Sequence, residues 1–183
     1  MFENLKKDLD AVMQRDPAVH SRAEVFFCYP GFKAIRRHRR AHKAYKKGHY
    51  FIARWISART KKKTGIDIHP GAQIGDGFFI DHGTGVVIGE TTVIGERVKI
   101  YQGVTLGGLS TRGGQSLRGK KRHPTIEDNV TIYANASIFG GETVIGRDSV
   151  IGASAIITSS VAPGTRVSIE SQPLRYRTNP TEK

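Results

Sequence analysis

The sequence predicts a mainly β fold, a parallel β-helix of hexapeptide repeats that follows an α-helical segment. Three observations predict it. An aliphatic residue recurs about every six residues up to Ile157, a second small or apolar residue stands two positions before it, and residues 1–65 lack both patterns. We therefore expect an α-helical segment at 1–65, a β-helix at 66–169 with an extruded loop at 107–124, and a basic tail at 170–183.

The six-residue period identifies the repeating unit. Neither an α-helix nor an isolated alternating strand repeats every six residues, whereas short internal repeats of this kind indicate coils stacked in a β-helix. Residues i and i−2 of a strand point to one side, so each unit sends two side chains inward before it turns. Three such units per coil give a triangular prism; a β-sandwich of short strands is the alternative. The first rail comprises Ile74, Ile80, Ile88, Ile94, Ile100, Leu106, Ile126, Ile132, Ile138, Ile145, Ile151 and Ile157, and the second comprises Ala72, Phe78, Val86, Thr92, Val98, Val104, Val130, Ala136, Thr143, Ser149 and Ala155.

The first 65 residues have apolar residues at helical spacing. Those from Phe2 to Met13 predict one helix, which ends near Asp16-Pro17 because proline disfavours a helical residue before it. Tyr29-Pro30-Gly31 is a predicted turn, and a second helical stretch covers 32–60.

This second stretch is strongly basic. Residues 25–66 contain thirteen lysines and arginines and no acid. Such a helix can bind nucleic acid, but a solvated face, or one packed against an acidic surface, is the favoured explanation, and we expect no nucleic-acid partner. Its histidines at helical spacing, His38, His42 and His49, have no accompanying acids or cysteines, so we expect no metal site.

The rails are interrupted twice. The step from Ile80 to Ile88 is eight residues, and the extra residues fall in Asp81-His82-Gly83-Thr84-Gly85. A regular scaffold that becomes irregular at an acid–histidine pair is a candidate site for chemistry. The second interruption is the glycine-rich, basic loop at 107–124, which resembles a binding arm more than a nucleic-acid segment.

Composition sets further bounds. With 183 residues the chain suits one domain and an appendage. The single cysteine, Cys28, excludes an intrachain disulfide framework and indicates a reducing compartment, so we expect a cytoplasmic protein. Residues 1–7 have no apolar signal region, and no apolar run is long enough to span a membrane. The formal net charge of +13 favours anionic ligands without identifying one.

Several motifs together resemble those of bacterial serine acetyltransferase, over about residues 10 to 165. They are Asp67-Ile68-His69-Pro70, Ile80-Asp81-His82-Gly83-Thr84-Gly85, Gly89-Glu90-Thr91, Gln102-Gly103-Val104-Thr105-Leu106-Gly107-Gly108 and Arg122-His123-Pro124, with Arg15-Asp16-Pro17-Ala18 and Gly31-Phe32 in the helical segment. The resemblance implies a left-handed parallel β-helix and a homotrimer. It implies a hexamer only if the short helical segment still pairs two trimers.

The implied reaction is the transfer of an acetyl group from acetyl-CoA to L-serine, which gives O-acetyl-L-serine and CoA, the first committed step to cysteine. A serine hydroxyl needs a general base to attack a thioester. The resemblance assigns that base to His82 and the acid that orients its imidazole to Asp67. The resemblance also implies that serine attacks acetyl-CoA directly, while both are bound to the enzyme in a ternary complex.

The resemblance also implies the residues that bind serine. The ammonium group meets Asp16 and Asp81, although Asp16 would also suit a helix cap. The carboxylate meets cations at Arg122 and His123, and arginine matches a carboxylate with two parallel hydrogen bonds. The backbone amide of Gly108 is expected to stabilise the oxyanion.

CoA is expected in a groove between neighbouring β-helices, against exposed backbone of small-residue turns. The expected contacts are Thr105, Gly107, Ala134, Ala136, Ala153, Ser154 and Arg175, with Arg177 and Lys121 as further candidates for the 3′-phosphate. The family's Gly-x-Pro-Ala near the end is replaced here by Ser168-Ile169-Glu170-Ser171-Gln172-Pro173.

The resemblance extends to partners. Cysteine resembles serine, so feedback inhibition by cysteine is implied. Family members often end in an isoleucine that enters O-acetylserine sulfhydrylase, whereas this sequence ends in Asn179-Pro180-Thr181-Glu182-Lys183 and gives little support for that complex. Two alternatives stay open: a related hexapeptide acetyltransferase with another small hydroxyl acceptor, and, less favoured, a basic nucleic-acid-binding module.

Overall fold

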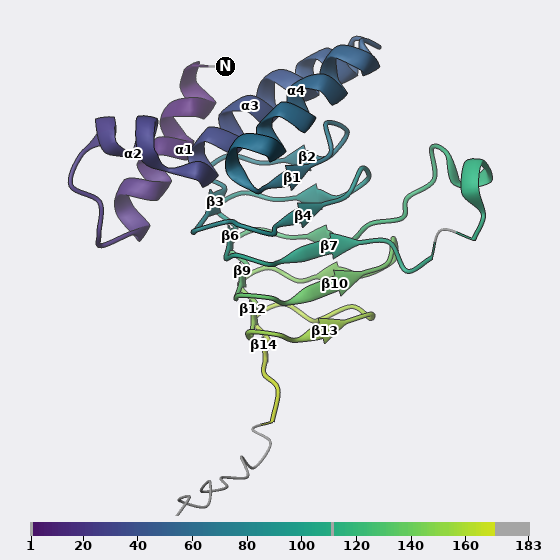
Figure 1. Ribbon diagram of the computed structural model, residues 1–183. Coiled ribbons are helices and arrows are strands. Elements are labelled where there is room, and N and C mark those ends of the chain that lie inside the picture. The colour runs from purple at the N-terminus through teal and green to yellow at the C-terminus, as the bar shows by residue number, and fades with distance from the viewer. Residues whose placement is uncertain (1, 111, 171–183) are drawn as a thin grey trace, which may run out of the picture.

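The computed structural model of the protein describes residues 2–110 and 112–170. Figure 1 shows the helices gathered over one end of the stacked strands. The helices are α1 (Phe2–Arg15), α2 (Arg22–Cys28), α3 (Pro30–Lys46) and α4 (Tyr50–Thr64).

The helical stretch expected over 32–60 is two helices, so the prediction of one was wrong. Gly48 has φ +79°, a left-handed conformation that only glycine adopts without strain, and it ends α3. The chain then reverses, and α4 packs along α3. The expected turn at Tyr29-Pro30-Gly31 is instead a helix start, since Pro30 is the first residue of α3, where its missing N–H leaves no hydrogen bond unmade.

The strands form a left-handed parallel β-helix, which confirms the predicted fold. Paired strands are parallel and align each first-rail residue with the one a full coil later, as Ile74 with Ile94 and Ile88 with Leu106. We call the three sheets faces A, B and C. Face A consists of β1 (Asp67–Ile68), β4 (Val87–Ile88), β7 (Thr105–Gly107), β10 (Ser137–Phe139) and β13 (Ile156–Ile157); face B of β2 (Gln73–Ile74), β5 (Val93–Ile94), β8 (Thr125–Ile126) and β11 (Val144–Ile145); face C of β3 (Phe79–Ile80), β6 (Lys99–Ile100), β9 (Thr131–Ile132), β12 (Val150–Ile151) and β14 (Arg166–Val167).

The two rails fill the interior of the prism. Every second-rail residue is buried, including its hydroxyl-bearing members. Two of these satisfy their hydroxyls locally: Thr143 Oγ1 donates to the Phe139 carbonyl at 2.7 Å and Ser149 Oγ to the Ala162 carbonyl at 3.0 Å. The expected inward side chains are therefore the core.

Two corners of the prism border face A. The CA corner, where the chain passes from face C to face A, is formed by the turns at 81–86, 101–104, 133–136 and 152–155. The AB corner is formed by the turns at 69–72, 89–92 and 140–143 and by the long loop between β7 and β8, which contains the short 3₁₀ helix η1 (Gly114–Leu117). In Figure 1 this loop leaves one lateral edge of the β-helix, whereas α1 and α2 lie beside the opposite edge.

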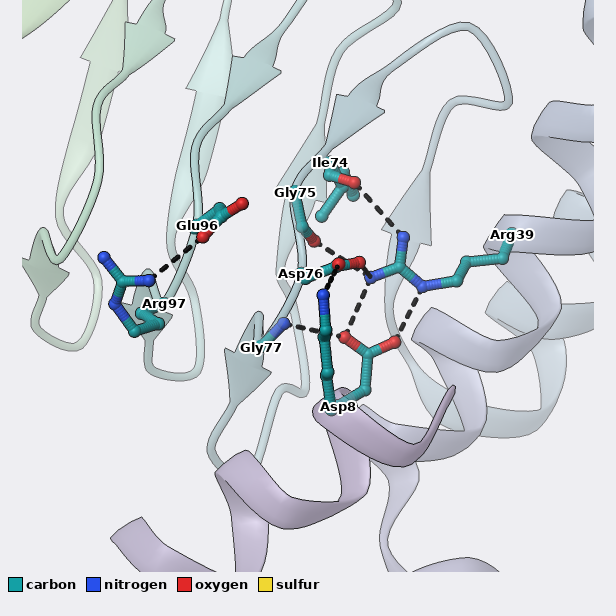
Figure 2. Close-up of polar contacts among 9 residues, drawn as sticks. Asp8, Arg39, Ile74, Gly75, Asp76, Gly77, Glu96 and Arg97 are labelled. Carbon is teal, nitrogen blue, oxygen red and sulfur yellow. Dashed lines mark hydrogen bonds and ion pairs between the residues drawn. The ribbon is translucent and has the colours of Figure 1, made fainter. Parts of the chain in front are cut away.

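A buried ion pair fixes the helical segment on the first coil, as Figure 2 shows. The Arg39 guanidinium of α3 makes two bonds to the Asp8 carboxylate of α1, Nε to Oδ2 at 2.7 Å and Nη2 to Oδ1 at 2.8 Å. Arg39 also donates to the carbonyls of Ile74 and Gly75, and Asp8 Oδ1 accepts the Gly77 amide at 3.1 Å. The position of α1, and of Asp16 that follows it, is thereby tied to the β-helix.

Candidate active site

His82 stands on the outside of the CA corner. It is exposed and has φ +56°, a conformation rare for a residue with a side chain. The next residue must be glycine, because a Cβ on Gly83 would lie 2.6 Å from Ile66 Cδ1 and 2.9 Å from Ile80 Cγ2. The two extra residues of the long turn therefore form a tight bend that presents an imidazole to solvent.

Asp67, the expected orienting acid, lies at the same corner. Its backbone amide donates to the Val86 carbonyl at 2.9 Å, which places the start of β1 beside the turn that carries His82. In the described part of the chain its carboxylate pairs with Lys61 Nζ at 2.8 Å and makes no hydrogen bond to His82. The Lys61 side chain is 60% exposed, so this ion pair is open to exchange with solvent.

The two acids expected to bind the substrate ammonium both act on Tyr29. Asp16 Oδ2 accepts the Tyr29 hydroxyl at 2.8 Å, while Asp16 Oδ1 accepts the Ala18 amide at 2.8 Å. Burial, the hydrogen bond to Asp16 and the negative charges of Asp16, Glu24 and Asp81 raise the pKa of Tyr29 to about 12. Tyr29, which sequence reasoning missed, therefore holds Asp16 in place, and the negative charge of Asp81 reaches the same hydroxyl.

Asp81 has a second unexpected partner, Lys99 of β6. Lys99 Nζ lies 3.1 Å from Asp81 Oδ2, and both side chains are largely buried. Residues 81 and 99 are separated by one coil of the β-helix, so no short sequence motif indicates that they pair.

Arg122 and His123 lie at the AB corner, where Glu90 and Thr91 hold them. An ion pair joins Arg122 Nη2 to Glu90 Oε2, and Glu90 Oε1 accepts the Tyr45 hydroxyl at 2.8 Å. Thr91 Oγ1 accepts the backbone amides of Arg122 at 2.8 Å and His123 at 3.1 Å. Glu90 and Thr91 are in the quoted Gly-Glu-Thr motif, but sequence reasoning gave them no role.

The contacts of His123 favour a neutral imidazole that donates from Nε2, whereas the sequence analysis expected a cation there. The Thr91 backbone amide donates to His123 Nδ1 at 3.2 Å, and the Thr91 hydroxyl lies 2.9 Å from the same atom. A nitrogen that accepts an N–H carries no proton, so the proton is on Nε2. Burial, followed by the charge of Arg122, lowers the pKa of His123 to about 4.

Two glycines shape the surroundings of His123. A Cβ on Gly89 would lie 1.9 Å from His123 Cδ2, so the imidazole packs directly on the Gly89 backbone. A Cβ on Gly108 would lie 3.9 Å from His123 Nε2, which puts the expected oxyanion donor next to the histidine's N–H.

One chain does not bring all these residues together. His82, Asp67 and Asp81 lie at the CA corner, whereas Arg122 with its neighbours lies at the AB corner, across face A. Asp16 follows α1, which packs against β3 of face C, and it bonds to Tyr29. Figure 1 shows the two corners at opposite edges of face A, so that face separates the two groups within one chain.

The residues expected along CoA lie at the two corners and on face A between them. Ala134, Ala136, Ala153 and Ser154 stack below His82 in the CA corner, where the Ser154 amide donates to the Ala134 carbonyl at 2.8 Å. Thr105 and Gly107 are the first and last residues of β7 on face A. Lys121 lies at the AB corner, and Arg175 and Arg177 fall outside the described residues.

No helix within the described residues is long and apolar enough to cross a membrane. The same part of the chain has no group of three or more metal-ligating side chains.

The comparisons with known proteins all indicate one family. Residues 1–37 match the family model described as serine acetyltransferase, N-terminal. Serine acetyltransferase of Bacillus subtilis is 55% identical over 87 residues, which are 48% of this chain and 40% of that protein. That of Helicobacter pylori is 51% identical over 85 residues, 46% of this chain and 50% of that protein.

Solved structures extend the similarity to nearly the whole chain. Serine acetyltransferase isoform 3 of Entamoeba histolytica, in complex with cysteine, has a TM-score of 0.88 and 41% identity over 97% of this chain and 61% of that one. The Neisseria gonorrhoeae serine acetyltransferase in complex with serine has a TM-score of 0.84 and 39% identity over 94% of this chain and 68% of that one. The chain thus spans about two fifths of the Bacillus relative and about three fifths to two thirds of these structures, and it belongs to the serine acetyltransferase family.

Proposed function

We propose that the protein is a serine O-acetyltransferase that transfers the acetyl group of acetyl-CoA to the hydroxyl of L-serine. The observation that carries the proposal is the exposed His82 next to Asp81, at a corner whose counterpart across face A presents Arg122; Asp16, bonded to Tyr29, is the second expected acid. A zwitterion with a hydroxyl matches this set: an ammonium for the acids, a carboxylate for the arginine, and a proton for the histidine. The family relatives in complex with serine and with cysteine support it.

In the proposed reaction His82 is the general base. The serine oxygen attacks the thioester carbonyl while its proton passes to a nitrogen of His82. The tetrahedral intermediate then collapses, the C–S bond breaks, and the CoA thiolate takes the proton back from His82. Asp67 would orient the imidazole and stabilise its cation, which requires its carboxylate to turn from Lys61 toward His82.

The AB corner would bind the serine carboxylate and stabilise the oxyanion. Arg122 is poised as a cation, held by Glu90. His123, being neutral, would contribute a hydrogen bond from Nε2 rather than a charge. The Gly108 amide beside it would donate to the oxyanion, and both donors are fixed before substrate arrives, which is what makes such groups effective.

A complete site requires a neighbour, so we propose a homotrimer in which the CA corner of one chain faces the AB corner of the next. The surfaces around face A support such packing. Phe51 and Trp55 of α4 are 83% and 51% exposed, and Ile156 on face A is 74% exposed. Three copies related by rotation would cover these apolar side chains and close the ring; pairing of two trimers would give a hexamer.

Acetyl-CoA would lie in the groove between neighbouring chains, along the stacked turns that carry Ala134, Ala136, Ala153 and Ser154. Cysteine, which differs from serine by one atom, would compete for the same acids and arginine, and the cysteine-bound relative supports this. A free thiol at Cys28 and a CoA substrate suit a reducing, cytoplasmic setting.

The test is an acceptor panel with acetyl-CoA, in which release of free thiol is followed for L-serine, D-serine, L-homoserine, L-threonine and an amino sugar. We expect kcat/KM to be highest for L-serine and negligible for the sugar, which has no carboxylate for Arg122. A higher kcat/KM for another hydroxyl acceptor would replace serine as the substrate. Thiol release that does not depend on any acceptor would overturn the transferase itself.

A further inference from the structure

Lys99 occupies an enclosed position on face C. Ile100 points into the core, so Lys99, the preceding residue of β6, points outward, in register with Phe79 of β3. Its ammonium nitrogen lies 4.8 Å from the centroid of the Phe79 ring and 4.6 Å from that of Tyr101, distances at which a cation is attracted to an aromatic face. The same nitrogen lies 3.1 Å from Asp81 Oδ2.

The surroundings hold this lysine in one arrangement. Its side chain is only 15% exposed and that of Asp81 19%. Tyr101 is stacked on Tyr133 of the next coil, with ring centroids 5.1 Å apart and planes at 14°, so the aromatic wall beside the ammonium is itself supported. Burial alone would lower the pKa of Lys99, but hydrogen bonding to Tyr101 and Asp81 and the charge of Asp81 outweigh it, and the pKa is raised. Lys99 is therefore a fixed positive charge at the pH of any assay.

This ion pair fixes one side of the carboxylate that precedes His82 in the chain. An ionised carboxylate accepts hydrogen bonds at both of its oxygens, so the bond from Lys99 to Oδ2 leaves Oδ1 to accept an ammonium group. The orientation of this carboxylate is therefore set before a substrate arrives.

We propose that Lys99 is a positioning residue for Asp81. It binds one carboxylate oxygen, fixes the orientation of the group, and leaves the other oxygen for the substrate ammonium. This proposal rests on the proposed function, since it presumes an amino-acid substrate at the CA corner. Lys99 lies on face C, far from the AB corner, and would set the affinity for serine without touching the substrate.

The kinetic test compares three variants: Lys99→Met, which keeps the length and apolar stem, Lys99→Arg, which restores the charge, and Lys63→Met, an exposed lysine of α4 that contacts no proposed substrate residue. In Lys99→Met we expect KM for serine to rise about tenfold, while KM for acetyl-CoA stays near the wild-type value. Lys99→Arg should restore most of the wild-type KM for serine, and Lys63→Met should change neither KM value.

A merely structural ion pair would behave differently. It would lower the melting temperature of Lys99→Met, or reduce kcat, without separating the two KM values. An unchanged KM for serine in folded Lys99→Met would overturn the proposal.

A second measurement is independent of turnover. Calorimetric titration with L-serine, in the absence of acetyl-CoA, should give a Kd about tenfold higher for Lys99→Met than for the wild type, and Lys99→Arg should restore it. If the wild type fails to acetylate serine but this difference is seen, the proposed function fails and the Lys99–Asp81 link stands; if serine is acetylated and the Kd is unchanged in Lys99→Met, only the link fails.

Discussion

Gly89→Ala tests the arrangement of the AB corner, because the substituted atom would meet one side chain. The alanine Cβ would lie 1.9 Å from Cδ2, 2.2 Å from Nε2 and 2.7 Å from Cγ of His123. Ordinary contact begins at 3.4 Å, so the ring would have to move by about 1.5 Å. The backbone of Gly89 is not in the left-handed region, since it is absent from the positive-φ glycines, so alanine adds no strain of its own.

The ring cannot move that far and keep its hydrogen bonds to Thr91. A misplacement of about 1 Å in a positioned group can cost about 10² in rate, which corresponds to about 2.7 kcal/mol. We therefore expect kcat/KM for serine to fall about 10²-fold in Gly89→Ala, while the protein stays folded and KM for acetyl-CoA changes little.

The assay is a double-mutant cycle with His123→Ala, read as kcat/KM for serine. If Gly89→Ala acts through the imidazole, it should have almost no further effect once the imidazole is absent. Losses that simply multiply, or a Gly89→Ala enzyme within about threefold of the wild type, would refute the assigned contact between these residues.

Three further predictions concern the base, the arginine and a buried histidine. His82→Ala should lower kcat by about 10²–10⁴ with little change in melting temperature, and near wild-type turnover would remove His82 as the base. Arg122→Lys should raise KM for serine and spare KM for acetyl-CoA, because an ammonium cannot replace the two-pronged guanidinium; a collapse of acetyl-CoA affinity instead would move Arg122 to the phosphate site. Burial, aided by the charges of His42 and Arg39, lowers the pKa of His38 to about 3. Between these two pKa values the unfolded chain binds a proton that the folded chain does not. The free energy of unfolding should therefore be greatest above about pH 6.5 and fall toward pH 3 by up to about 1.4 kcal/mol per pH unit. Urea unfolding of His38→Gln should show a weaker dependence of this free energy on pH, and an equal dependence would contradict the prediction.

The fold could be predicted because the β-helix repeats its information at every coil. Each six-residue unit places the same two positions inward, so a single interruption, such as the step from Ile80 to Ile88, stands out against many regular ones. The helical segment has no such redundancy. Its break at Gly48 depends on one left-handed residue within an otherwise helical pattern, and the sequence analysis passed over it.

The site was only partly accessible from the sequence for a related reason. His82 was predicted because it lies where the repeat is interrupted, and Arg122 because Arg122-His123-Pro124 resembles a motif of the family. Tyr29, Lys99 and Thr91 were missed because their roles depend on contacts between segments far apart in the chain, such as that of Tyr29 with Asp16 or Lys99 with Asp81. The protonation of His123 was also hidden, since it depends on which nitrogen accepts the Thr91 amide.

The central claim is that each active site is shared by two chains, and mixing two inactive variants tests it most directly. His82→Ala damages the CA half-site and Arg122→Ala the AB half-site. In a trimer closed by rotation, every mixed trimer has one interface at which both halves are intact, so random 1:1 co-refolding should restore about one quarter of the wild-type activity. Light scattering should report a mass of three times 20.2 kDa, or six times if trimers pair. Activity from a monomer, or no recovery in trimers proven to contain both variants, would contradict the account.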